Sequence, residues 1–109
     1  MNKRTKALDI PRMVKEAVAR RDSFDGWTCC ILCGQPAPPD HPTEFSCAHF
    51  IPRSHGGLGV EKNILTLCPK CHQRYDNSSE RERLREEFKE YLNSCYPDWD
   101  EQKLIYRKE

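Results

Sequence analysis

The sequence lacks any long run of apolar residues. No stretch of its 109 residues approaches the roughly 18 apolar residues that a membrane-spanning helix needs, and the basic residues 1–6 are not followed by the apolar segment of a secretory signal. We therefore expect no membrane partner, and we expect the chain to reside in the reducing cytoplasm.

A strong net charge and a large apolar content are also missing. The chain has 18 Lys and Arg against 17 Asp and Glu, so its net charge of +1 gives no overall signal for nucleic acid or for a membrane surface. Hydrophobic residues make up only 37% and charged residues 32%. A chain of this length forms one small domain, residues 1–109, and so thin a core needs disulfides or a bound metal.

Charge of each sign is nevertheless grouped along the chain. Residues 1–21 hold seven basic and two acidic residues, residues 22–47 hold four acidic and no basic residues, and residues 48–75 hold four basic residues and one acidic. Residues 76–109 are acidic again. This distribution is compatible with a polyanion bound at one face, but charge alone favours the alternative of ordinary solvated surface.

Apolar spacing and capping residues predict three helices and two strands. The first helix covers residues 10–21, with Asp9 as its cap. Strands over 44–50 and 64–67 flank a glycine-rich loop, and a short helix follows from Pro69 through Tyr75.

The third predicted helix is amphipathic and covers residues 79–95. It begins with a capping box formed by Ser79 and Glu82. After it, a last helical turn is expected to carry Leu104 and Ile105 back onto the domain.

Cysteine is the residue type that this short chain has in abundance. Seven cysteines are an odd number, which fits a disulfide framework poorly. Two pairs share a two-residue spacing, Cys30 with Cys33 and Cys68 with Cys71. Four thiolates suit a tetrahedral zinc ion and leave no open coordination position, so the spacing predicts a structural zinc site.

Three other cysteines are left over. Cys29 adjoins the first pair and is an alternative to Cys30 as a ligand, because a three-residue spacing to Cys33 is sterically possible. Cys47 and Cys95 are expected to be small core residues. A redox role for a two-residue cysteine spacing would need a thioredoxin-like strand–helix–strand pattern, which the sequence does not have.

Histidines are interlaced with the second cysteine pair. If the two strands form a hairpin and the following helix packs across it, His49 projects from the end of the first strand. His72 and Asp76 then share one face of the helix, because they are four residues apart. Such a set suits a divalent ion or general-base chemistry. The alternative is that both histidines are further zinc ligands or plain surface residues.

These motifs resemble the HNH family of endonucleases, the ββα-metal nucleases. The resemblance lies in HFIPRSHGG, a following Asn63 and then LCPKCH, together with the upstream cysteine pair of the zinc-containing branch. Residues 9–22 also resemble the helix that precedes the first cysteine pair in small phage-type members. The implied fold is a small α+β, zinc-stabilised domain with a ββα core, an N-terminal helix and a C-terminal amphipathic helix.

The resemblance also implies roles for three residues. His49 falls on the general base that deprotonates the attacking water, Asn63 on the residue that holds the catalytic loop in shape, and His72 on a ligand of the catalytic divalent ion. Many members have an acidic metal ligand immediately before the base, and here that position is Ala48. Asp76 is a candidate replacement.

We therefore interpret the chain as a metal-dependent DNA endonuclease with structural zinc and a catalytic ion such as Mg²⁺, Mn²⁺ or Ni²⁺. Within this domain, residues 1–26 form a basic arm and a helix. Residues 27–76 hold the two zinc knuckles (the cysteine pairs) and the ββα core, and residues 77–109 form a helical extension. The resemblance implies a bacterial or phage-encoded protein that acts on double-stranded DNA, with a phage packaging subunit as a partner. The alternative is a non-catalytic zinc module that binds nucleic acid or protein. Six basic residues are candidate phosphate contacts: Arg53, Lys70, Arg74, Lys3, Arg4 and Lys6.

Overall fold

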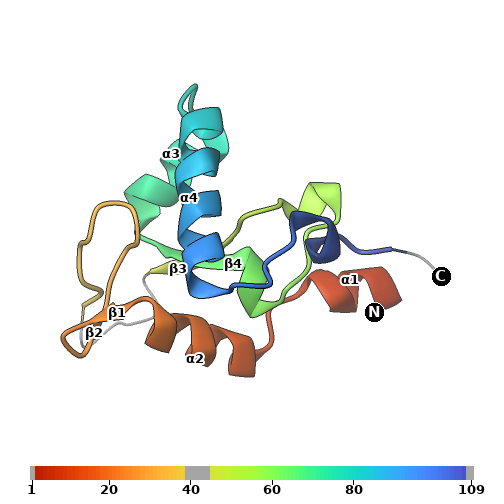
Figure 1. Ribbon diagram of the computed structural model, residues 1–109, viewed down its shortest axis with the longest axis horizontal. Helices are drawn as coiled ribbons and strands as arrows, with labels where there is room; N and C mark the ends of the chain where they lie inside the picture. Colours follow the sequence, from red (N-terminus) through yellow and green to blue (C-terminus); the bar gives the residue numbers. More distant parts are fainter. Residues whose placement is uncertain (1, 39–44, 108–109) are drawn as a thin grey trace.

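A short antiparallel hairpin followed directly by a helix occupies the middle of the chain. The computed structural model describes residues 2–38 and 45–107. Strand β3 (Ser46–His49) pairs with β4 (Ile64–Leu67), and the register runs from Ser46↔Leu67 to His49↔Ile64. Helix α3 (Pro69–Asn77) comes directly after β4. The strand–strand–helix order expected for the core is therefore present (Figure 1).

The sequence explains why these elements form where they do. All four residues of β4 are buried: three are apolar, and Thr66 is the buried polar exception. Pro69 occupies the first turn of α3, where its missing N–H removes no helical hydrogen bond. The Cys68 sulfur caps this helix by accepting from the Cys71 N–H. Residue 44, the start of the predicted first strand, lies outside the described residues.

Two helices, rather than one, precede the first cysteine pair. Helix α1 (Lys3–Leu8) was not predicted; the Asn2 side chain caps it by accepting from the Thr5 N–H at 2.7 Å. Helix α2 (Arg12–Arg21) follows after a short break. The predicted cap Asp9 is wrong, because Pro11 is the N-cap and makes no side-chain bond to the helix.

A second hairpin, also not predicted, links α2 to the first cysteine pair. Strands β1 (Ser23–Phe24) and β2 (Trp27–Thr28) pair across a turn in which Asp25 and Gly26 have φ angles of 53° and 83°. The Asp-Gly dipeptide is typical of a two-residue hairpin turn with positive φ at both positions.

Helix α4 (Arg81–Cys95) covers the hairpin and α3 with its apolar face. Leu84, Phe88 and Leu92 are buried, and the Phe88 ring packs edge-on against Tyr75 at 4.9 Å between centroids. The predicted capping box is wrong: the N-cap is Glu80, whose carboxylate instead binds Arg74.

The chain then returns through η4 (Glu101–Leu104), as predicted, with Leu104 in the core and Ile105 packed against it. Cys95 at the end of α4 is half-buried rather than a core residue. No helix in the described part of the chain is long and apolar enough to cross a membrane.

The adjacent pair Arg21 and Asp22 fixes α2 against the outer edge of β4. Asp22 is buried, and its carboxylate accepts from the Thr66 N–H at 3.0 Å. Arg21 donates to the Ile64 carbonyl at 2.7 Å and to Asp22. Two side chains thus occupy backbone groups that a third strand would otherwise pair with. This contact places α2 on the side of the hairpin away from α3 (Figure 1).

Candidate active site and metal centre

Four cysteines converge beside the start of α3. The sulfur atoms of the two predicted pairs all lie within 4.8 Å of one another. The Cys33 and Cys68 sulfurs are 3.8 Å apart. Cys29 is not part of the group, and its sulfur lies 3.3 Å from the Trp27 carbonyl oxygen. Cys30, not Cys29, therefore belongs to the cluster of Cys30, Cys33, Cys68 and Cys71, which is positioned to hold a metal ion.

The surroundings of the cluster fit bound metal. Burial raises the pKa of Cys30, but backbone groups of Cys33, Cys68 and Leu32 bond to its sulfur, and the net effect is a lowered pKa. Burial together with the neighbouring sulfurs raises the pKa of Cys71. Four thiol donors this close together would repel one another as thiolates, and a bound cation removes that repulsion. This donor set fits a closed, structural metal site.

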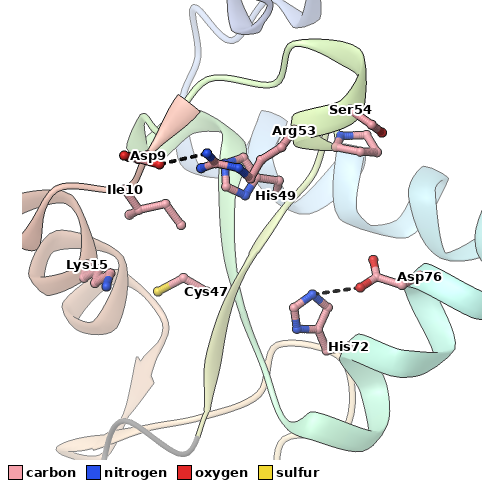
Figure 2. A pocket seen from close by; sticks show the side chains of 10 residues that line it. Asp9, Ile10, Lys15, Cys47, His49, Arg53, Ser54, His72 and Asp76 are labelled. Atoms are coloured by element: carbon pink, nitrogen blue, oxygen red, sulfur yellow. Dashed lines mark ion pairs between the residues drawn. The ribbon is translucent and has the colours of Figure 1, made fainter. Parts of the chain in front are cut away.

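A separate cavity opens between α2 and α3, with β3 between them (Figure 2). The sequence-predicted residues His49, His72, Asp76 and Arg53 all line it. The other six lining residues were not predicted as site residues: Asp9, Ile10, Lys15, Cys47, Pro52 and Ser54.

His49 is held by a carbonyl from the N-terminal segment. It is the last residue of β3, and its Nε2 lies 2.9 Å from the Leu8 carbonyl oxygen. Because a carbonyl only accepts, Nε2 carries the proton, and in the neutral ring Nδ1 is then the basic nitrogen. Burial lowers the pKa of His49, and Arg53 and His72 act in the same direction. The neutral, proton-accepting form is therefore favoured at neutral pH.

His72 and Asp76 occupy the α3 wall of the cavity. The His72 Nε2 lies 3.0 Å from the Asp76 carboxylate, as their spacing of four residues predicts. Asp76 is also 4.0 Å from Arg81. Figure 2 shows this pair across β3 from Lys15 and Cys47.

Asn63 is not in the cavity but fixes the loop that borders it. Its buried side chain accepts from the Ile51 N–H at 2.8 Å and donates to the Leu58 carbonyl at 2.8 Å. The side-chain amide of Asn63 thus hydrogen-bonds to both ends of the glycine-rich loop. Gly57 is required here, because a Cβ at that position would lie 1.7 Å from the Ile51 oxygen.

The candidate phosphate contacts do not gather at one place. Arg53 lines the cavity, but its guanidinium is bound to Asp9 at 2.8 Å and to the Leu8 carbonyl at 2.8 Å. Lys70 and Arg74 each lie two residues from His72, about 200° around α3, and so face away from the cavity. Lys3, Arg4 and Lys6 are exposed on α1, where Arg4 reaches the Arg53 carbonyl at 3.4 Å.

Alternation along β3 separates Ala48 from its neighbours. Cys47 and His49 face the cavity, whereas Ala48 is 1% exposed and belongs to the hydrophobic core. Cys47 is half-buried, so its assignment to the core was wrong. The period of two in a strand was the signal that would have placed Cys47 beside His49; nothing in the sequence marked Lys15.

Together these features define a small ββα domain with a histidine-lined cavity and a separate four-cysteine cluster that is positioned to hold a metal ion. Residues 30–78, a little under half of the chain, match the family model for HNH endonuclease, so this segment is similar to that family. A stretch of 27 residues is also 52% identical to part of Anaredoxin from Nostoc sp.. That match covers 25% of this chain and 36% of Anaredoxin, so it spans only about a third of that protein.

Proposed function

We propose that this protein is a metal-dependent DNA endonuclease that uses His49 as its general base. The observation that carries the proposal is the orientation of His49, whose Nε2 bonds to the Leu8 carbonyl while its ring lines the same cavity as His72. A neutral imidazole with a fixed tautomer is suited to take a proton from water. Nδ1 of His49 is then the atom that accepts it.

The α3 wall supplies the ligands for the catalytic ion. His72 and Asp76 offer one nitrogen and a carboxylate from adjacent turns. A bound divalent cation supplies Lewis-acid stabilisation of the charge that develops on the phosphate and the leaving oxygen. Asn63 acts at a distance, because its two backbone partners set the loop that follows His49.

The four-cysteine cluster has a structural role in this proposal, with zinc as its ion. Three of its sulfurs belong to buried residues, and the cluster ties the first cysteine pair to the start of α3. Double-stranded DNA is the proposed substrate. We place site selection with a partner such as a phage packaging subunit, or with DNA shape.

A second candidate is a zinc-bound interaction module without chemistry. Two observations favour it: Ala48 replaces the usual acidic ligand, and the described residues hold no group of three ligands other than the cysteine cluster. The similarity to Anaredoxin, a protein not named as a nuclease, points the same way.

Cleavage of supercoiled plasmid with Mg²⁺, Mn²⁺ or Ni²⁺ separates the two candidates. We expect His49→Ala to retain its zinc and to lose cleavage by about 10²–10⁴-fold, the usual cost of removing a general base. The matched control is His55→Ala, since His55 is exposed in the same loop and does not line the cavity. Equal activity of the two variants would exclude His49 as the base, and no cleavage by the unmodified protein with any ion would favour the interaction module.

A further inference from the structure

Lys15 is a basic residue that lines the cavity and has no role in the proposed reaction. It lies on α2 and lines the cavity together with His49 and His72. Lys15 is exposed to solvent, and its ammonium group has no carboxylate partner among the described residues. An uncompensated positive charge beside a candidate active site is available for an anionic ligand.

The other cation of the cavity is already neutralised. Arg53 bonds to the Asp9 carboxylate at 2.8 Å and to the Leu8 carbonyl at 2.8 Å. Recruiting Arg53 to a phosphate would break both contacts. Lys15 therefore offers an anion the more accessible positive charge within the described cavity.

Lys15 and the proposed metal ligands lie on opposite sides of β3. Figure 2 shows Lys15 and Cys47 on one side of this strand, and His72 with Asp76 on the other. Burial raises the pKa of the Cys47 thiol, and the charge of Lys15 acts on it in the opposite direction, as expected for close neighbours. The cavity thus has the proposed metal ligands on one wall and a lone ammonium on the opposite wall.

We propose that Lys15 binds a backbone phosphate of the cleaved strand next to the scissile one, so that the strand crosses the cavity from α3 toward α2. The proposal rests on the proposed nuclease function, and it deepens it by identifying the residue that positions the substrate. A lysine ammonium is a compact point charge that binds phosphate oxygens without base specificity. The contact would therefore set strand position and affinity, not sequence preference.

The test measures binding separately from cleavage. The probe is a fluorescently labelled DNA duplex, and its Kd is determined over a series of salt concentrations in the His49→Ala background, where the strand stays intact. Lys15→Ala is compared with Arg20→Ala, which removes the same charge from the same helix at an exposed position outside the cavity. The zinc content of each variant verifies its fold.

We expect Lys15→Ala to weaken binding about 5- to 20-fold and to reduce the salt slope by about 0.9, the value for one lost phosphate contact. Arg20→Ala should change Kd less than about twofold, and Lys15→Arg should restore most of the affinity. Equal effects of Lys15→Ala and Arg20→Ala, or no binding of DNA at all, would overturn the proposal. DNA binding that depends on Lys15 in a protein that never cleaves would reject the nuclease function but keep this site.

Discussion

At the scale of single residues, the position before the proposed base has the clearest consequence. A carboxylate is usual there in the family that the sequence resembles, but Ala48 is 1% exposed and packs in the core. Its neighbour Cys47 faces the cavity from the same strand. A carboxylate introduced at position 48 would therefore lie in the hydrophobic core, whereas one at position 47 would face the cavity.

We predict that Ala48→Asp destabilises the protein and that Cys47→Asp does so much less. A buried, unpaired carboxylate costs about 3 kcal/mol or more of unfolding free energy, whereas one in an open cavity stays hydrated. Chemical denaturation without an added divalent ion measures the difference, and Ala48→Asn controls for side-chain volume. Recovery of the wild-type midpoint of Ala48→Asp on adding Mn²⁺ would instead show that its carboxylate reaches an ion held by His72.

At the scale of elements, the C-terminal end of α1 contributes to the candidate site. The Leu8 carbonyl bonds both His49 and Arg53, and the Gly59 N–H donates to the Ala7 carbonyl at 3.0 Å. Gly59 permits this close approach, because a Cβ there would lie 1.9 Å from the Asp9 oxygen.

We predict that Gly59→Ala lowers cleavage by about tenfold or more without loss of zinc. The added methyl group displaces residues 8 and 9, and small displacements of a positioning group are costly to catalysis. The control is Val60→Ala, at the neighbouring position, where the side chain is 39% exposed. Unchanged kcat in Gly59→Ala would show that the Leu8 carbonyl does not orient the base.

Sequence patterns predicted the central elements because local signals and burial agree there. The strand expected before the glycine-rich loop, the mostly apolar segment Ile64–Leu67 and Pro69 at a helix start all agree with the structure. Helix α1 was missed because residues 3–8 have few apolar positions, and its docking depends on Gly59, which is distant in the sequence.

The candidate site was predicted only in part, for a related reason. The spacing of His72 and Asp76 is local and was readable, whereas the bond between His49 and Leu8 joins residues 41 positions apart. Lys15 likewise reaches the cavity only because Arg21 and Asp22 fix α2 against β4. No periodicity in a single sequence encodes such contacts.

At the scale of the whole molecule, we expect stability to depend on metal bound by the cysteine cluster. It joins the first cysteine pair to the β4–α3 junction, and 37% hydrophobic residues give a limited core. Structural zinc contributes on the order of 10 kcal/mol in small domains, comparable with the total stability of most of them.

We predict about one zinc per chain and loss of the folded state in Cys68→Ser. Elemental analysis and circular dichroism measure the two effects. Cys29→Ser is the matched control, because Cys29 adjoins a cluster residue but lies outside the cluster. A well-folded protein free of metal would contradict a structural role for the cluster.

The side chains that hydrogen-bond to the outer edge of β4 also affect the tendency of the protein to aggregate at high concentration. A two-stranded sheet with an open edge is a template for strands from other copies, and such pairing leads to aggregation. Here the Arg21 guanidinium and the Asp22 carboxylate occupy the Ile64 carbonyl and the Thr66 N–H, and the Ile31 N–H occupies the Thr66 carbonyl. The contact that positions α2 beside the cavity therefore also closes this edge to intermolecular strand addition, which favours a chain that stays dispersed at high concentration.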